Sequence, residues 1–233
     1  MLYKTGTLTN AAAFVIEGGR LGLAALTRAT LPTVTNNSPL VLRTGATLYA
    51  INNTTNGIHL LNTVTVDGVV TNEYQTHTLS FSYLGDVRGT GTVVNYLNGS
   101  INTVSNRFLG SISPGFGPGT LTFDEATGVT ILGEPGMPVM LNIEDGDTLV
   151  LTNMGAAVDL ANIDVTFLTA TAKGTTNWFL YADNGFINDF NSINYGILTG
   201  ELVYEANRIG AVVVPEPCIA LVGLAGLLWS RRR

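Results

Sequence analysis

Turn-forming dipeptides recur at short intervals along the first 210 residues, and they limit every regular element to a short length. Asn and Gly adopt the positive backbone φ angles that tight turns need, so such pairs typically connect strands. Between such breaks we expect many short strands and few helices of ordinary length. The turn pairs are Gly18-Gly19, Asn36-Asn37, Asn52-Asn53, Asn56-Gly57, Asp67-Gly68, Asn98-Gly99, Asp145-Gly146 and Asn184-Gly185.

The segments between the turns have the composition of strands. Thr78–Tyr83 alternates polar and apolar side chains with a period of two, as half-buried strands do. The clearest strand candidates are Ile58–Val66, Thr76–Leu84 and Val139–Ile143, whereas Ala156–Asn162 is the nearest approach to a helix. The 31 Thr, 21 Asn and 12% charged residues also favour strands and turns over helices. We therefore predict an all-β body.

One short strand per turn is compatible with a β-sandwich, a barrel or a solenoid. The strand candidates are similar in length, similarly rich in Thr and Asn, and lack a distinctive aromatic core, which favours a solenoid of stacked coils. We predict a right-handed parallel β-helix, with a β-sandwich as the alternative. Residues 1–110 would form the N-terminal coils, 111–210 the C-terminal coils and a cap, and 211–233 a separate tail.

One passage adds a family resemblance to this prediction. Pro114-Gly115 and Pro118-Gly119-Thr120-Leu121 form a P-G-x-x-P-G-T-L element, and Asp147-Thr148-Leu149-Val150 follows further along the chain. The passage resembles autotransporter-like surface proteins, in which such an element precedes successive coils of a parallel β-helix. The resemblance implies the same fold here.

The end of the chain differs in character from the body. Cys218–Trp229 is uncharged and apolar on every helical face, Pro215 and Pro217 precede it, and Arg231–Arg233 follow it. Terminal arginines are typical of the cytoplasmic side of a membrane segment. We predict a short transmembrane-like helix, about 18 Å long against a bilayer core of about 30 Å.

The order of these elements resembles the PEP-CTERM sorting signal of Gram-negative bacteria. Val214, Pro215, Glu216 and Pro217 match its signature, and Arg231, Arg232 and Arg233 match its basic end. The resemblance implies cleavage by exosortase, a membrane sorting enzyme. It also implies a chain held transiently in the inner membrane by its tail and then placed at the cell surface or in the extracellular matrix, with extracellular polysaccharide as a further partner.

The beginning of the chain does not have the pattern of a signal peptide. Met1–Asn10 contains one Lys, and the apolar run Ala11–Ile16 is stopped by Glu17. Two interpretations stay open: a cytosolic protein, or a sequence that lacks its true N-terminus. The sorting tail favours the second.

Composition disfavours several other classes of function. The net charge of −6, without a basic patch interleaved with aromatic residues, disfavours a nucleic-acid partner. Cys218 is the only cysteine, so the body has no disulfide and no cysteine-based metal site. His59 and His77 are the only histidines and do not have the spacing of a metal site or a catalytic motif. We expect no cofactor.

Two acidic clusters are the remaining candidates for chemistry. Paired carboxylates can cleave a glycosidic bond when they lie roughly 5–9.5 Å apart. Asp124-Glu125 and Glu144-Asp145-Gly146-Asp147 are the two clusters, and the second has the composition of a solvated turn. Glu144, Asp145 and Asp147 are the calcium candidate, although the full spacing of a calcium loop is missing. We expect no catalytic residue and no other metal site.

The aromatic segment Asn177–Asn194 has two interpretations. Its side chains are expected to form an aromatic core in a terminal cap or docked loop, and a carbohydrate-binding platform is the alternative. These side chains are Trp178, Phe179, Tyr181, Phe186 and Phe190.

The sequence as a whole predicts an exported structural or adhesive surface protein that is not an enzyme. Its neutral faces, rich in Thr and Asn, would form hydrogen bonds with hydrated polysaccharide or with partner strands. Two alternatives stay open: a β-helical polysaccharide-degrading enzyme, and the C-terminal fragment of a larger autotransporter-like passenger.

Overall fold

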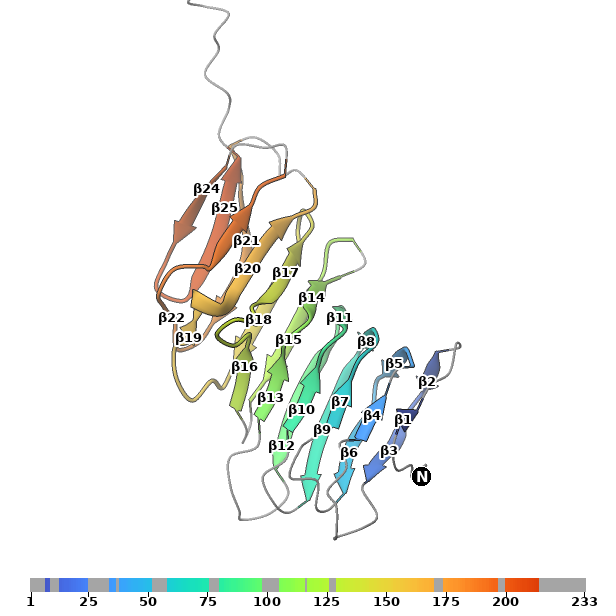
Figure 1. Ribbon diagram of the computed structural model, residues 1–233. Helices are drawn as coiled ribbons and strands as arrows, with labels where there is room; N and C mark the ends of the chain where they lie inside the picture. Colours follow the sequence, from blue (N-terminus) through green and yellow to red (C-terminus); the bar gives the residue numbers. More distant parts are fainter. Residues whose placement is uncertain are drawn as a thin grey trace, which may run out of the picture.

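The computed structural model describes residues 7–8, 13–24, 34–36, 38–51, 58–75, 80–97, 105–115, 117–125, 129–169, 174–196 and 200–213. They form a β-solenoid of about five turns (Figure 1). Three sheets, here called A, B and C, run along the solenoid, and successive coils pair in parallel. The predicted all-β parallel β-helix is therefore confirmed. The β-sandwich alternative is wrong, because sandwiches are built from antiparallel sheets.

The strands have the following bounds. Sheet A contains β1 (Thr7–Leu8), β4 (Val34–Asn36), β7 (Ile58–Leu60), β10 (Ser80–Tyr83), β13 (Ser105–Phe108) and β16 (Val129–Leu132). Sheet B contains β2 (Phe14–Ile16), β5 (Leu40–Arg43), β8 (Val64–Asp67), β11 (Asp86–Gly89), β14 (Ser111–Pro114), β17 (Val139–Ile143), β20 (Ile163–Phe167) and β23 (Ser192–Asn194). Sheet C contains β3 (Gly19–Ala24), β6 (Ala46–Ile51), β9 (Val69–Gln75), β12 (Thr92–Leu97), β15 (Thr120–Asp124), β18 (Thr148–Thr152), β21 (Thr176–Ala182), β24 (Gly200–Tyr204) and β25 (Arg208–Val213). A small fourth sheet pairs β19 (Val158–Asp159) with β22 (Phe186–Ile187), and the 3-10 helix η1 spans Leu160–Asn162.

The coils are stacked in register but differ in length. Along sheet B the stacked inward positions are separated by 24, 23, 25, 29 and 24 residues. Four of the extra residues of the longest step lie in the corner at 133–138, which is occupied by residues 109–110 in the preceding coil. Variable corners explain why the sequence shows no fixed repeat. These stacked positions are Leu40, Val64, Val87, Ile112, Leu141 and Val165.

Alternating side chains point into the solenoid and form one continuous apolar core. β17 shows the pattern, with Val139, Leu141 and Ile143 buried and Met140 exposed. Each coil therefore buries apolar area mainly against its neighbours, and stability is close to a sum over interfaces between coils.

An aromatic stack crosses the middle of the core. The ring of Phe108 lies 4.7 Å from that of Tyr83 and 4.3 Å from that of Phe123, and both pairs are stacked. The three residues belong to three strands from two sheets, β10, β13 and β15, so the stack joins neighbouring coils. The sequence did not predict this aromatic feature.

Glycine is required where the corners of successive coils touch. Gly68 follows β8 with a φ of +101°, and a Cβ there would lie 1.9 Å from Thr44 Oγ1 of the preceding coil. The predicted turn at Asp67-Gly68 is therefore confirmed, with steric contact as its cause.

One predicted strand is wrong, and another is described only in part. Ile58–Val66 is not a single strand, because a corner at residues 61–63 separates β7 from β8. At this corner the Asn62 side chain accepts a hydrogen bond from the Thr63 backbone N–H at 2.7 Å. Of the predicted strand Thr76–Leu84, the structure describes β10 and Leu84, and residues 76–79 lie outside the described residues. The prediction for Val139–Ile143 is confirmed as β17.

The C-terminal end of sheet C is covered by an antiparallel hairpin. β24 pairs with β25, which pairs with β21 across a register shift between Trp178 and Leu180. The Arg208 guanidinium lies 4.0 Å above the Trp178 ring and forms an ion pair with Glu205 at 2.7 Å. A parallel coil therefore no longer extends sheet C at this end, which limits end-to-end pairing.

The aromatic residues of Asn177–Asn194 divide between core and surface. Phe179 and Phe190 are buried and cluster with Phe167 of β20, which confirms the predicted aromatic core. Trp178 and Tyr181 point to the other side of β21 and are half-buried.

The predicted division of the body at residues 110 and 111 falls between β13 and β14. Sheets A and B both run through this point, since β13 pairs with β16 and β11 pairs with β14.

Candidate functional site

The residues of the sorting signal lie outside the described part of the chain. This holds for Val214, Pro215, Glu216 and Pro217, for the apolar stretch Cys218–Trp229, and for Arg231, Arg232 and Arg233. Within the described residues, no helix has the length and apolar character needed to span a membrane. The sorting signal and its helix therefore stay predictions.

The calcium candidate forms a turn between β17 and β18. The Asp147 backbone N–H donates to the Glu144 carbonyl at 3.1 Å, and the Glu144 N–H donates to Asp147 Oδ2 at 2.9 Å. Gly146 between them has a φ of +84°, so the predicted turn is confirmed. Asp145 is exposed whereas Asp147 is buried. Among the residues the structure describes, no three His, Cys, Asp or Glu side chains are placed together to hold a metal ion. The calcium site stays a prediction.

Asp147 supports the corner of the preceding coil. A Cβ on Gly115 would lie 2.7 Å from Asp147 Oδ1, and the Thr148 N–H donates to the Gly119 carbonyl at 2.8 Å. Burial raises the pKa of Asp147 to about 6, while backbone N–H groups of Glu144 and Gly119 lower it. The P-G-x-x-P-G element thus stacks directly on the acidic turn.

The outer face of sheet B carries rows of small polar side chains. Asp86 Oδ1 accepts hydrogen bonds from the hydroxyls of Ser111 and Ser113 of the next coil, at 2.8 and 2.9 Å. Ser113 in turn accepts from Asn142 at 3.2 Å. Further along, Asp164 accepts from Ser192 at 2.5 Å. These ladders connect neighbouring coils and present hydroxyl, amide and carboxylate groups in regular rows.

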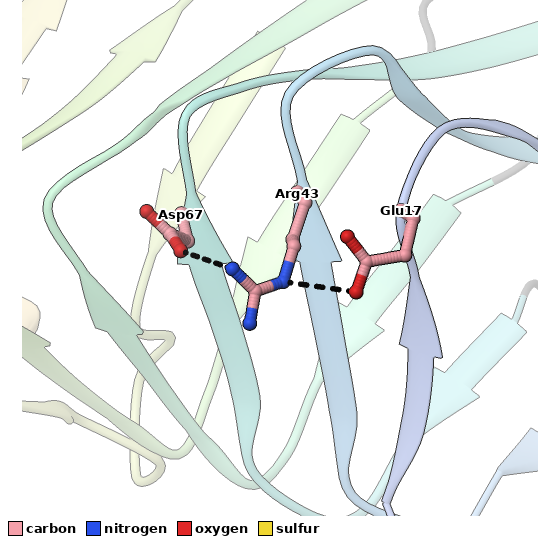
Figure 2. Close-up of polar contacts among 3 residues, drawn as sticks. All are labelled: Glu17, Arg43 and Asp67. Carbon is pink, nitrogen blue, oxygen red and sulfur yellow. Dashed lines mark hydrogen bonds and ion pairs between the residues drawn. The ribbon is translucent and has the colours of Figure 1, made fainter.

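A charged ladder continues this face toward the N-terminal end. Figure 2 shows Arg43 between Glu17 and Asp67, each on a different coil. The Arg43 guanidinium lies 3.4 Å from Glu17 Oε1 and 3.3 Å from Asp67 Oδ2. All three side chains are exposed, so the pair energies are small.

A buried polar network lies inside the solenoid, where sheet C ends and sheet A begins. Asn72 Nδ2 donates to Tyr83 Oη at 2.8 Å and to Asn95 Oδ1 at 3.2 Å. Asn106 Nδ2 also donates to Asn95 Oδ1. Asn95 Nδ2 donates to Glu125 Oε1 at 2.5 Å. The network spans four strands, and burial raises the pKa of Tyr83, so its hydroxyl keeps its proton.

Glu125 ends this network and is 3% exposed. Its Oε1 accepts from Asn95 and from the Thr130 hydroxyl, whereas Oε2 has no hydrogen-bond partner among the described residues. Burial raises its pKa to about 7, Asn95 lowers it, and the charge of Asp124 raises it further. A carboxyl group that exchanges its proton near neutral pH is thus held inside the wall of the solenoid.

The predicted acidic pair Asp124-Glu125 is separated by the strand geometry. Adjacent residues of an extended segment point to opposite sides. Glu125 lies inside the solenoid, whereas Asp124 is half-buried and its Oδ1 accepts from Asn153 at 2.6 Å.

A cavity of about 560 Å³ lies next to Glu125, where the wall of sheet A is interrupted. β16 has no parallel partner in the following coil, because β19 pairs with β22 instead. At its rim Arg107 Nε donates to Glu134 Oε1 at 2.8 Å. The cavity is lined by Glu125, Thr130, Ile131, Leu132, Gly133, Glu134, Pro135, Met154, Gly155, Ala156, Ala157, Val158, Asp159 and Asn162.

Glu125 was predicted as part of an acidic cluster, whereas the buried amide groups around it were not predicted. Asn72 and Asn95 are 23 residues apart, occupy paired positions and point inward. An inward Asn recurring at the length of one coil would have been a usable signal. Of the two histidines, His59 is half-buried in β7 and His77 lies outside the described residues.

Comparison with known proteins adds no identification. No protein-family model, curated protein or solved structure matches this chain.

Proposed function

We propose that this protein is an exported structural or adhesive protein of the cell surface or extracellular matrix, processed through its C-terminal tail. The observation that carries the adhesive part is the outer face of sheet B. There the paired outward positions Thr65, Arg88, Ser113, Asn142 and Thr166 place one polar side chain on each of five successive coils, from β8 to β20. On β2 and β5 the same position is apolar, at Val15 and Val41. A regular row of hydroxyl and amide groups matches the repeated hydroxyl groups of a hydrated polysaccharide.

The tail supports the sorting part of this proposal. Pro215 and Pro217 disfavour a helix and produce an extended joint, which a sorting enzyme can reach. The apolar stretch Cys218–Trp229 would form the short membrane helix, and exosortase would release the body. We also propose that the coil of the body is right-handed, which is the hand that parallel crossover connections strongly favour.

The test of sorting is processing in a host that carries exosortase. Glu216→Ala is expected to leave the full-length chain in the membrane, whereas the wild type loses its tail, as measured by mass spectrometry. Glu201→Ala, in an exposed position of β24, is the matched control and should be processed normally. Normal loss of the tail from the Glu216 variant would refute sorting through this motif.

The alternative of a polysaccharide-degrading enzyme predicts a different result. The full-length protein, incubated with extracellular polysaccharide, is expected to bind it without shortening it. A fall in viscosity together with new reducing ends would replace our proposal with the enzyme.

A further inference from the structure

The interruption of sheet A leaves a cavity in the wall of the solenoid that is open to solvent. On one side of it the coils touch, since the Glu125 N–H donates to the Thr152 carbonyl at 2.9 Å. On the other side they touch again, because a Cβ on Gly133 would lie 2.0 Å from the Asn162 carbonyl oxygen. Between these contacts, residues 153–157 leave the position that a strand paired with β16 would occupy. The cavity is therefore bounded at both ends of the β16 segment.

Glu125 forms part of the cavity wall and is 3% exposed. Its Oε2 has no hydrogen-bond partner among the described residues, and its accessible surface is less than 1 Å², so a molecule in the cavity does not reach this atom. An unpaired buried oxygen costs free energy. Its position is fixed, because Asn95 and Thr130 hold the other carboxyl oxygen.

The free edge of β16 adds backbone groups to the same cavity. The Gly133 N–H donates to the Phe108 carbonyl of β13. Because backbone groups alternate in direction along a strand, the N–H and C=O of Thr130 and Leu132 point to the opposite edge, toward the cavity. Both kinds of hydrogen-bonding group are thus available beside Glu125.

The lining excludes one class of ligand and favours another. Glu134 is paired with Arg107 at the rim. The other acidic residues of the lining, Glu125 and Asp159, leave it with a net negative charge. The remaining wall is largely apolar, from side chains such as Met154 and Val158. An anion would be repelled, whereas a compact molecule with several hydroxyl donors and an apolar face is complementary.

We propose that this cavity binds a single non-anionic sugar unit, with the backbone groups on the free edge of β16 forming hydrogen bonds to its hydroxyl groups. This inference builds on the proposed function, because it assigns the recognition of polysaccharide to a particular place. The cavity is bounded at both ends, so the unit is a chain end or a side branch, and the interior of a polymer chain does not pass through it.

The test is isothermal titration calorimetry of the full-length protein with glucose, galactose, mannose, N-acetylglucosamine, glucosamine and glucuronate. At least one of the first five sugars is expected to bind with a Kd on the order of 1 mM, a typical strength for so small a ligand. Glucuronate is expected not to bind, because the cavity is acidic. Absence of binding by all six, or tighter binding of glucuronate, would overturn the proposal.

Two variants separate this cavity from other surfaces. Ala157→Leu fills the cavity and should abolish binding, whereas Ala161→Leu, exposed and outside the lining, should leave binding unchanged. Unchanged binding in Ala157→Leu that retains the wild-type thermal unfolding would contradict the proposed site.

Failure of the cavity proposal can be distinguished from failure of the proposed surface function. If the protein is found at the cell surface and retains polysaccharide in the Ala157→Leu variant, the cavity proposal fails and surface adhesion stands. If single sugars bind the cavity but the chain is never exported, the site stands and the surface function fails.

Discussion

The coils from β4 to β15 and the coils after β16 bury apolar side chains in the same alternating pattern, but they differ in sheet A. In the first region all three sheets pair from coil to coil, and the core contains stacked aromatic rings and a connected amide network. In the second region sheets B and C continue while sheet A gives way to the small β19–β22 pair. A solenoid can therefore gain a cavity without losing its core, by displacing a single strand.

The largest effect is expected in the continuous region. Phe108→Ala should lower the free energy of unfolding by about 3–5 kcal/mol, because the ring is 1% exposed and stacked on both sides. Phe190→Ala near the C-terminal end should cost less, since its ring is 8% exposed and has one looser aromatic contact at 6.2 Å. Urea unfolding measures both. Equal losses would show that the two regions are packed alike.

The pH dependence of the free energy of unfolding should reveal the titration of Glu125, whose carboxyl group lies at the boundary of the two regions. Its ordinary pKa of 4.5 is raised by burial to about 7 in the fold, so the folded state holds the proton of Glu125 more tightly. Stability should therefore fall by about 3 kcal/mol between pH 4.5 and 7 and then level off. Asp147, with a pKa raised to about 6, adds a fall of the same sign at slightly lower pH.

Glu125→Gln isolates this contribution. The variant should match the wild type near pH 4 and be the more stable protein at pH 8, as measured by urea unfolding across the pH range. An identical pH profile in the two proteins would mean that Glu125 titrates normally and is not held in a buried network.

The amide network should matter more than the polar ladders of the surface. Asn95→Ala removes the donor to Glu125 and the acceptor of Asn72 and Asn106, and should cost about 2–3 kcal/mol. Asn142→Ala on the outer face is the matched control and should cost about 0.5 kcal/mol or less. A cost for Asn95→Ala as small as that of the control would contradict the role given to the network.

The smallest effect is expected in the charged ladder of Figure 2. Arg43→Ala should change the free energy of unfolding by no more than about 1 kcal/mol, because both ion pairs are exposed. The change should shrink further in 1 M salt, which screens exposed charges. A large loss that persists at high salt would show that the aliphatic part of Arg43 contributes through packing.

Strands and turns that depend only on neighbouring residues in the sequence are predicted correctly. The strand Val139–Ile143 and the turns at Asp67-Gly68 and Asp145-Gly146 follow from alternation and turn chemistry, and the structure has all three. The corner inside Ile58–Val66 escaped prediction, because Asn62 turns the chain within an otherwise strand-like run.

Features that depend on pairing between coils could not be predicted. An acidic residue that follows a strand is typically solvated, and the burial of Glu125 depends on Asn95 and Thr130, which lie elsewhere in the sequence. The cavity arises because β19 pairs with β22 and not with β16, which no local pattern reveals.

The most direct test of the proposed function is hydrogen exchange of the full-length protein, bound to extracellular polysaccharide from a bacterium that carries exosortase. We expect the amides of residues 130–134 and 154–162 to be protected by the polysaccharide, with smaller changes along the outer face of sheet B and none in the core strands β9 and β12. If the polysaccharide protects no amide from exchange, the proposed adhesive function is contradicted. Protection that leaves the cavity segments unchanged would contradict the assignment of recognition to the interrupted sheet.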